Sequence, residues 1–372
     1  MKKIYYITAV FATLFLVGCG DGIDLPGVNV ETDLNKIPLP DNNVNLEQVE
    51  LKPSTEPMLH EGLHTEEDFQ RIRDKKAAGE EPWVSAYQLL VESQFSQKTA
   101  DTYPTEWIKR GISGDENYMN AARGATIVYQ QALRWKIEQD DEYAAKAVEN
   151  LNKWVQTCVG VTGNTNLSLA AGLYGYEFAI AGELLRDYGG WDRADFAAFQ
   201  NWLLKVFYPA NDDFLKRHHD TNALHYWANW CLCNIAAKMA IGIVTDRRDI
   251  YNEGIAHLQT GDTNGRLRRA IYHDYAPDYN FAQWQESGRD QGHTLMCVGL
   301  MGIICQLAWS QGDDFFAYDD NLFLRACEYA ACCNYTNETV PYTTYIWQKQ
   351  SQWGYPIPEE QTTLGGGKWI KR

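Results

Sequence analysis

The sequence predicts an all-α protein, and more closely an (α/α) toroid, that is, an incomplete barrel of helical hairpins. Long segments carry apolar residues at three- and four-residue spacing and alternate with polar turns. Segments 168–185 and 295–308 are apolar almost all round, which indicates helices buried on two sides. Sustained strand-like alternation is absent. An α-solenoid and an irregular bundle are the alternatives, and the lack of a fixed-period repeat disfavours the solenoid.

Each expected helix has its own signals, beginning at residue 65. Thr65 with Asp68 three positions later forms a capping box, which opens the first helix. Pro82 suits the first turn of the next one. We expect one helical domain, residues 57–372. The later helices are expected at 117–138, 141–158, 166–187, 192–207, 221–245, 248–260, 290–311 and 319–334.

Residues 1–18 have the pattern of a lipoprotein signal peptide. Lys2 and Lys3 precede an apolar run, residues 4–17, that is too short for a spanning helix. Small residues then lead to Cys19, the arrangement that a lipoprotein signal peptidase accepts. Cys19 is therefore the expected site of lipid attachment. The alternative is an ordinary secretory signal with an incidental cysteine.

The segment after the cysteine, residues 19–56, is rich in Pro, Asp and Asn and shows no periodicity. It is expected to be a flexible linker between lipid and domain. The predicted location is the cell envelope, with the protein lipid-anchored to the outer membrane on its periplasmic or cell-surface face. Contact with the membrane is expected only through this anchor.

Composition narrows the partners. The formal net charge is −16, and loss of Lys2 and Lys3 would make it −18, which argues against a nucleic acid partner. An anionic substrate stays compatible, because a binding site can be locally basic. The 22 Tyr and 13 Trp can fill a core or stack on sugar rings. None of the nine cysteines forms a CxxC pair, so neither a zinc site nor a disulfide framework is predicted.

Three segments combine polar side chains with aromatic ones. In the first, residues 218–230, the spacing of Asn222, His225 and Asn229 places them on one face of the helix expected there. His, Asn and Trp together are unusual and favour a helix whose start faces a cleft. The alternative is a capped helix start with satisfied polar groups.

The second segment, residues 266–279, places Arg268 and Arg269 close to His273 and several tyrosines. The planar guanidinium group bonds two oxygens of a carboxylate, so this pattern suits the binding of a uronate. Tyrosine and histidine could exchange protons with it. The alternative is a solvated basic turn with tyrosines that only pack.

The third segment, residues 283–294, is dense in hydrogen-bonding side chains and leads into an apolar helix. It contains Glu286, Arg289 and His293, and its glycines let a ligand approach the backbone closely. Polar groups at the mouth of a buried helix are how ligand sites are lined. The alternative is a polar loop that caps the helix.

These motifs, in this order, resemble the alginate lyase superfamily of α/α-toroid polysaccharide lyases, and most closely polysaccharide lyase family 38. The resemblance covers residues 57–335. The motifs that carry it are His60-Glu-Gly-Leu-His64-Thr-Glu-Glu-Asp68, His225-Tyr-Trp-Ala-Asn-Trp230, Arg268 through Tyr272-His-Asp-Tyr-Ala276, and Glu286-Ser-Gly-Arg-Asp-Gln-Gly-His293.

The resemblance implies an enzyme that cleaves a 4-linked uronate glycan, such as alginate or glucuronan, by β-elimination. It implies that Tyr275 is the catalytic acid and that Asn222 and His225 neutralise the carboxylate. The base is either His225 or Tyr275 itself, and Arg268 orients Tyr275 or the substrate. His219 competes with His225 for the histidine role, and Arg269 with Arg268 for the arginine role. The substrate-binding residues it implies are His219, Tyr226, Trp227, Arg269, His273, Glu286, Arg289 and His293.

The chemistry needs these residue types. Removal of the proton on C5, beside a carboxylate, builds negative charge that Asn, Arg or His can stabilise. A Tyr or His takes that proton, and a Tyr protonates the leaving oxygen. A tyrosine base would need its pKa lowered, which a neighbouring Arg would do. The mechanism requires no metal or other cofactor.

Two departures and two rival functions remain. In better-known alginate lyases the Asn and the His are adjacent, whereas here Asn222 lies three residues before His225. The tail after Cys333 leaves closure of the toroid in question. A toroid glycoside hydrolase would need two facing carboxylates, for which Glu286 and Asp290 are candidates. A non-catalytic glycan-binding lipoprotein is the other rival. The protein is expected to act as a monomer on an acidic polysaccharide.

Overall fold

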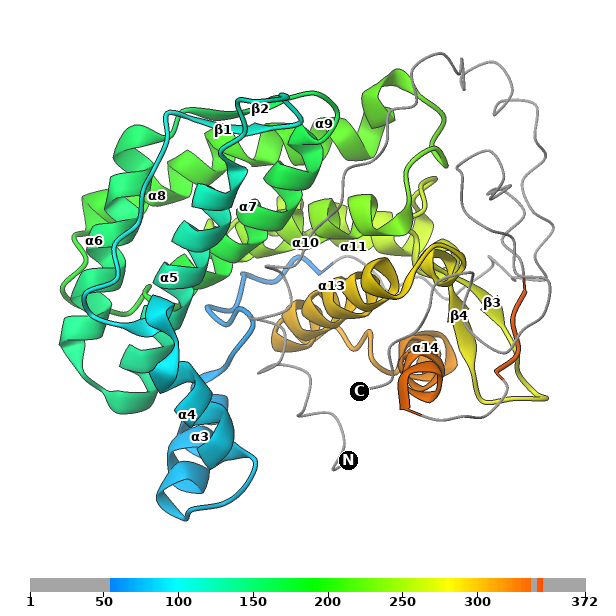
Figure 1. The fold of residues 1–372 in the computed structure, drawn as a ribbon, viewed down its shortest axis with the longest axis horizontal. Coiled ribbons are helices and arrows are strands. Elements are labelled where there is room, and N and C mark those ends of the chain that lie inside the picture. Colours follow the sequence, from blue (N-terminus) through cyan, green and yellow to red (C-terminus); the bar gives the residue numbers. More distant parts are fainter. Residues whose placement is uncertain (1–53, 336–339, 344–372) are drawn as a thin grey trace.

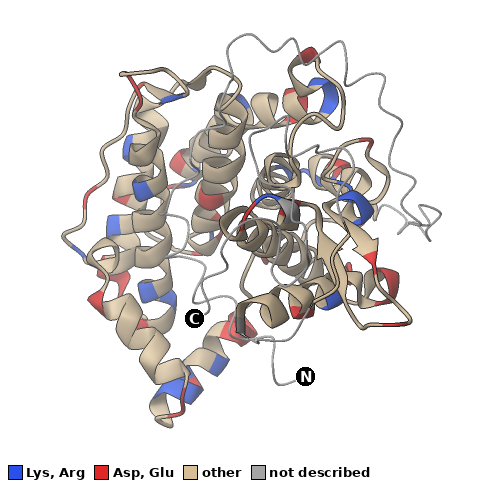
Figure 2. Cartoon of the chain, turned by 45° about the vertical axis from the view of Figure 1, so that its right-hand side comes forward, with Lys and Arg blue, Asp and Glu red and all other residues tan. Residues whose placement is uncertain are grey.

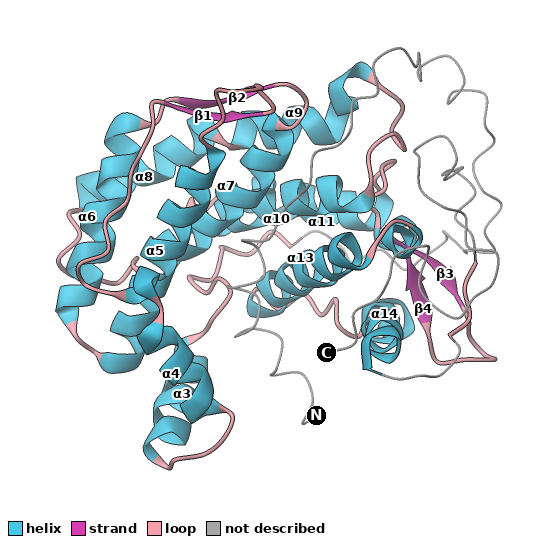
Figure 3. Cartoon of the chain, in the orientation of Figure 1, coloured by secondary structure: helices cyan, strands magenta, loops and turns pink. Residues whose placement is uncertain are grey.

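The structure is a computed structural model that describes residues 54–335 and 340–343. The predicted signal peptide, Cys19 and nearly all of the linker lie outside the described residues, as do residues 344–372. The described chain is mostly helical, with two short two-stranded sheets (Figure 3). The expected all-α fold with an incomplete toroid of helical hairpins is confirmed.

Four helices form a curved row at the centre of the molecule (Figure 1). Asn234 donates to the carbonyl of Ser168, and Arg186 donates to the carbonyl of Val244, so the second and third helices of the row are parallel. Each helix of the row packs on the next. Tyr118, at the start of the first helix, stacks on Tyr174 of the second, and Asn229, at the start of the third, donates to Met296 of the fourth, so the N-termini of all four lie at the same end of the molecule. The four helices are α5 (Tyr118–Glu138), α7 (Leu167–Leu184), α10 (Ala228–Val244) and α13 (Gln291–Ser310).

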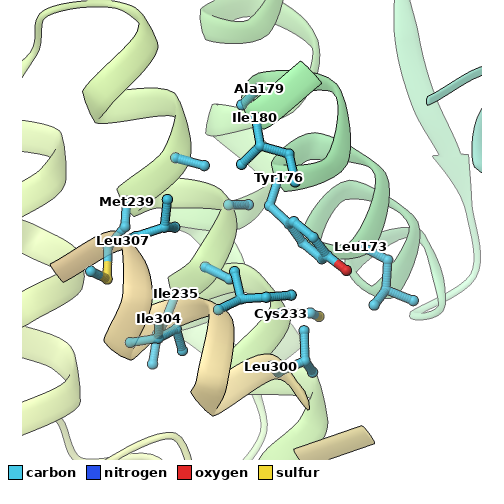
Figure 4. Packing of buried hydrophobic residues seen from close by; sticks show 14 of the residues in the cluster. Leu173, Tyr176, Ala179, Ile180, Cys233, Ile235, Met239, Leu300, Ile304 and Leu307 are labelled. Carbon is cyan, nitrogen blue, oxygen red and sulfur yellow. The ribbon is translucent and has the colours of Figure 1, made fainter. Parts of the chain in front are cut away.

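The core lies between these helices. Every residue of α10 is buried, and so is nearly all of α7. Figure 4 shows Leu173 and Tyr176 from α7, Ile235 from α10, and Leu300 and Ile304 from α13 meeting in one apolar layer. Burial on both sides explains why these helices are apolar all round, as the sequence predicted.

Outer helices cover this row and alternate with it along the chain. Two short strand pairs decorate the fold: β1 pairs parallel with β2 beside the start of α7, and β3 pairs antiparallel with β4. The remaining helices are α3 (Glu66–Ala77), α4 (Trp83–Glu92), α6 (Asp141–Thr157), α8 (Arg193–Val206), α9 (Tyr208–Arg217), α11 (Arg248–Thr260), α12 (Leu267–Ala270) and α14 (Tyr318–Tyr335). The short elements are η2 (Gln94–Ser96), η3 (His218–Asp220), η4 (Gln285–Gly288), β1 (Trp107–Arg110), β2 (Gly160–Gly163), β3 (Ile271–Asp274) and β4 (Ala282–Trp284).

Most predicted helices are confirmed to within a few residues, including the capping box at Thr65 and Asp68. The helix expected at 221–245 is wrong at its start, because α10 begins only at Ala228. Asn222 and His225 therefore do not share a helix face with Asn229. Helix α9 and the four strands were not predicted.

A segment of extended chain crosses the end of the row opposite the N-termini, and we call residues 54–64 the floor segment. Gln311, just after α13, exchanges hydrogen bonds with the backbone of Leu59, and Arg248 donates to the carbonyls of Glu56 and Pro57. His64 bonds Tyr129 of α5, with 2.6 Å between Nε2 and the hydroxyl oxygen. The floor segment thus joins both ends of the helical row, which no helix of residues 54–335 bridges in Figure 1.

Helix α13 is long and apolar enough to cross a membrane by length and composition alone. It carries no Lys, Arg, Asp or Glu, whereas Figure 2 shows both signs of charge spread over the surface helices. Most of α13 is buried against α10 and α14. These contacts are those of a core helix.

Candidate active site

The three polar segments predicted from the sequence all lie near the N-terminal ends of α10 and α13, and the structure joins them to one another. The first and second meet through Asn264, a buried residue just before α12. Its Nδ2 donates to the carbonyls of Leu224 and Tyr226, at 3.0 and 2.8 Å. The turn that carries His225 is therefore held by the segment that leads to Arg268.

The third segment caps the helix that follows the first. Gln285 Oε1 accepts a hydrogen bond from the backbone N–H of Ala228 at 2.8 Å, and Glu286 Oε1 accepts one from Asn229 at 3.4 Å. These N–H groups open α10 and have no partner within the helix. A carboxylate at this point also suits the positive end of the helix dipole.

The second and third segments meet as strands β3 and β4. His273 lies opposite Gln283, and Ile271 opposite Trp284. Trp284 is fully buried and donates from Nε1 to the carbonyl of Ala326 at 3.0 Å, which fixes the strand pair to α14. All three segments therefore form one connected unit.

Asn222, His219 and His225 lie before α10, where hydrogen bonds and ring contacts hold them. Asn222 Oδ1 accepts from the backbone N–H of Leu224 at 2.9 Å, so Asn222 stabilises a turn. His219 bonds Ser168 at the start of α7, with 3.0 Å between Nε2 and Oγ. The ring of Tyr226 lies against His219 and His225, with centroids 5.7 and 4.8 Å apart.

Burial keeps several of these imidazoles neutral. It lowers the pKa of His218 to about 3, and it also lowers the pKa of His219 and of His273. A neutral imidazole has a lone pair that can accept a proton. His219 and His273 are half-buried, whereas His218 is buried against Phe214, with ring centroids 4.6 Å apart.

The two candidate arginines are held in ways that the sequence did not predict. The guanidinium group of Arg268 forms an ion pair with Asp319 at the start of α14, and its Nε has no hydrogen-bond partner in residues 54–335 and 340–343. Arg269 donates to the carbonyl of Asp262. Arg268 is the more deeply buried of the two, and its ion-pair partner is a carboxylate.

Tyr275 follows β3 and is partly buried. Its hydroxyl group lies 2.5 Å from Gln283 Oε1 and 3.2 Å from Thr343 Oγ1. The ring of His273 lies against it, with centroids 4.5 Å apart. Burial raises the pKa of Tyr275. The expectation that a neighbouring arginine lowers this pKa is wrong, because Arg268 pairs with Asp319 and burial dominates.

The third segment contains a buried ion pair and a cap. Glu286 is fully buried, burial raises its pKa, and Arg289 opposes that shift from 3.5 Å. The guanidinium group of Arg289 also lies over the ring of Trp227, 5.2 Å from its centroid. Asp290 caps α13 through the N–H of His293 and bonds the same residue's Nδ1 at 2.6 Å. Asp290 and His293 thus have a structural task at the helix start.

The described residues offer neither a metal site nor a disulfide. Within residues 54–335 and 340–343, no group of three His, Cys, Asp or Glu side chains is placed to hold a metal ion. The eight cysteines in this part of the chain are free thiols, most of them buried among apolar side chains. They behave as small apolar residues.

Sequence reasoning missed Gln283, Gln285 and Asn264 as individual site residues. Each is fully buried, and each bonds a group that is far away in the sequence. The only signal available was the density of amide side chains around a predicted buried helix. A buried Gln or Asn has hydrogen-bonding needs that some other segment must meet.

Comparison with solved structures identifies the architecture. Alginate lyase A1-III from Sphingomonas species A1 is similar at 13% identity, with a TM-score of 0.52 over 74% of this chain and 79% of that one. A variant of alginate lyase A1-III complexed with tetrasaccharide gives 12% identity and a TM-score of 0.54 over 74% and 78%. An alginate lyase from Bacteroides ovatus gives 15% identity and a TM-score of 0.51 over 79% and 86%. The fold is therefore that of the α/α-toroid lyases.

The sequence itself identifies the family. The family model described as alginate lyase matches residues 73–338, which include the three polar segments. The chain belongs to the alginate lyase family and is a polysaccharide lyase. No curated protein matches it.

Proposed function

We propose that this enzyme cleaves an acidic, 4-linked uronate glycan of the alginate or glucuronan kind by β-elimination. The observation that carries the proposal is the connected unit formed by the three polar segments, whose members include a partly buried tyrosine, neutral histidines and an arginine. Solved structures of similar fold include one complexed with tetrasaccharide. An acidic glycan accounts for the need for arginine there.

In this reaction Tyr275 acts as the acid. A base takes the proton on C5, the electrons of that bond form the C4–C5 double bond, and the C4–O bond breaks. The leaving oxygen takes the proton of Tyr275. Burial raises the pKa of Tyr275 and so favours the protonated phenol, which is the form an acid needs.

The base is a histidine. His225 is our first assignment and His219 the alternative, because both lie against Tyr226 in the turn before α10. Burial lowers the pKa of His219, which leaves its imidazole neutral and able to accept a proton. The remaining base candidate is His273, whose ring contacts Tyr275 directly.

Arg268 and Asn222 neutralise the substrate carboxylate in this proposal. Arg268 now faces the carboxylate of Asp319, so a uronate would exchange one carboxylate partner for another. Loss of a single group that stabilises the developing charge is worth about 3–4 kcal/mol, so each should affect turnover strongly.

One assay tests the function. Purified protein is incubated with polymannuronate, polyguluronate and glucuronan while ultraviolet absorbance reports the new double bond. We expect absorbance to rise with at least one polymer, and Tyr275→Phe to lower kcat by at least about 10²-fold. Tyr279→Phe is the matched control, because Tyr279 is 51% exposed and its ring also contacts Tyr275.

The same assay separates the rivals. New reducing ends without ultraviolet absorbance would indicate a hydrolase, and binding without either product would indicate a glycan-binding protein. A folded Tyr275→Phe variant with full activity would remove Tyr275 from the mechanism.

We also propose that Cys19 carries a lipid that holds the enzyme at the outer membrane. The proposal rests on the sequence pattern around Cys19. Cys19→Ser should release the protein from membrane fractions without changing kcat. Membrane association that survives this change would refute the anchor.

A further inference from the structure

Gln283 lies at the centre of the hydrogen bonds around Tyr275. It is fully buried on β4. Its Oε1 accepts from the hydroxyl of Tyr275 at 2.5 Å and from the backbone N–H of Thr343 at 2.8 Å. Its Nε2 donates to Tyr272 at 3.0 Å, to Ser287 at 2.9 Å and to the carbonyl of Thr343 at 3.0 Å. Both ends of the amide are therefore engaged.

The backbone of Thr343 decides which way the amide points. A backbone N–H can only donate and a carbonyl can only accept, so Oε1 must face the N–H and Nε2 the carbonyl. Oε1 is thus the atom that meets Tyr275. Because an amide oxygen cannot donate, the hydroxyl of Tyr275 must be the donor in that 2.5 Å hydrogen bond.

The amide is also fixed in space. Gln283 lies opposite His273 in the strand pair, and its neighbour Trp284 is tied to α14 by a hydrogen bond to Ala326. A hydrogen bond to the neutral form of an acid favours that form. Gln283 therefore favours the protonated phenol and also fixes the position of its oxygen.

We propose that Gln283 is a positioning residue for Tyr275, which holds the phenol oxygen in place and keeps it protonated until the leaving oxygen arrives. The inference rests on the proposed function. In the acid step the O–H group turns from Gln283 Oε1 to the leaving oxygen and gives up its proton as the C4–O bond breaks. Solvent then returns a proton to the phenolate, and the hydrogen bond to Gln283 forms again.

The experiment compares two changes at this position. Gln283→Leu removes both ends of the amide, and we expect kcat to fall about 10- to 100-fold while KM changes less than about threefold. The basic limb of the kcat profile should move to lower pH, because the neutral phenol loses its acceptor. Gln283→Glu keeps an acceptor oxygen, so it should recover most of the lost kcat and move the basic limb to higher pH.

Gln131→Leu is the matched control. Gln131 is also a fully buried glutamine, and it bonds Gln97, Ala100 and Asn150 within the helical part of the fold. Thermal unfolding should show a comparable loss of stability for both leucine variants. Only the change at Gln283 should alter kcat and its pH profile.

The outcomes are distinguishable. A wild-type enzyme that yields no unsaturated product overturns the proposed function itself. An active wild type with a folded Gln283→Leu variant of unchanged kcat and pH profile overturns the positioning role alone. An equal fall of kcat in Gln131→Leu would do the same. If Gln283→Leu does not fold, the pH profile of Gln283→Glu decides, and an unmoved basic limb counts against the proposal.

Discussion

Phe178 in the helical row and Gln283 in the β3–β4 region are both fully buried, but the two regions are held together differently. Around Phe178, on α7, the neighbours are the rings of Trp154, Trp202 and Phe207, with centroids 5.2 to 6.1 Å away. Around Gln283, on β4, the neighbours are hydroxyl groups and backbone amides. Apolar contact has no preferred direction, whereas a hydrogen bond fixes both distance and angle.

This difference separates stability from chemistry within one domain. The row can supply the free energy of folding without placing any single atom accurately. The β3–β4 region carries a high share of buried polar groups, and each of these lowers the stability of the fold unless it has a hydrogen-bond partner. That arrangement is costly for stability and suits a site in which one hydroxyl group must be held accurately.

The largest effect is expected in the row. Phe178→Ala should lower the free energy of unfolding by about 3–5 kcal/mol, because a fully buried ring is replaced by a cavity. Urea unfolding measures it. The kcat of the protein that remains folded should be unchanged, and a large fall in kcat would show that the two regions are not separable in this way.

The second effect depends on pH and concerns Glu177, an ionisable residue of the row. Burial on α7 raises the pKa of Glu177 from 4.5 to about 8. The protonated form is thus favoured in the folded state, so stability present below pH 4.5 is lost as pH rises toward 8. Glu177→Gln should remove that loss, with a slope of at most about 1.4 kcal/mol per pH unit. Urea unfolding of the wild type and of Glu177→Gln measures this, and a stability difference between them that is the same at pH 5 and pH 8 would contradict it.

A smaller effect is expected where the two regions join. Asn264→Ala leaves two backbone carbonyls of the turn that carries His225 without their donor. This should lower the free energy of unfolding by about 1–3 kcal/mol. We expect kcat to fall as well, because the turn loses its support. Asn150→Ala is the control: Asn150 is equally buried and bonds the backbone of Thr102 and Ala100. It should lose stability without loss of kcat.

The smallest expected effect is that of metal removal. The proposed stabilisers are Asn, His and Arg side chains, so treatment with EDTA should leave kcat unchanged. Activity lost to EDTA and restored by calcium or zinc would replace this mechanism with a metal-assisted one.

The same difference explains what the sequence could predict. Helices α5 and α6 were predicted from apolar periodicity and α7 and α13 from long apolar runs, and both signals lie within the helical segment itself. The start of α10 was misplaced because its capping groups, Gln285 and Glu286, lie almost sixty residues away. Strands of three or four residues are too short to show alternation.

The candidate site also has features that the local sequence predicts and features that it does not. The three polar segments stood out by composition, and the structure connects them. The ion pair of Arg268 with Asp319 and the amide of Gln283 could not be predicted, because both depend on partners from distant parts of the chain. The catalytic roles of Tyr275, His225, Asn222 and Arg268 remain predictions.

The floor segment has a consequence for how the enzyme would meet a polymer. The described chain starts at Ser54, whose carbonyl is held by Asn252 at the end of the row opposite the candidate site. A lipid at Cys19 would attach through 35 residues (54 − 19), a tether of at most about 120 Å. Because such a tether would join the molecule at the end opposite the candidate site, that site would stay free to meet glycan chains too large to diffuse to the membrane.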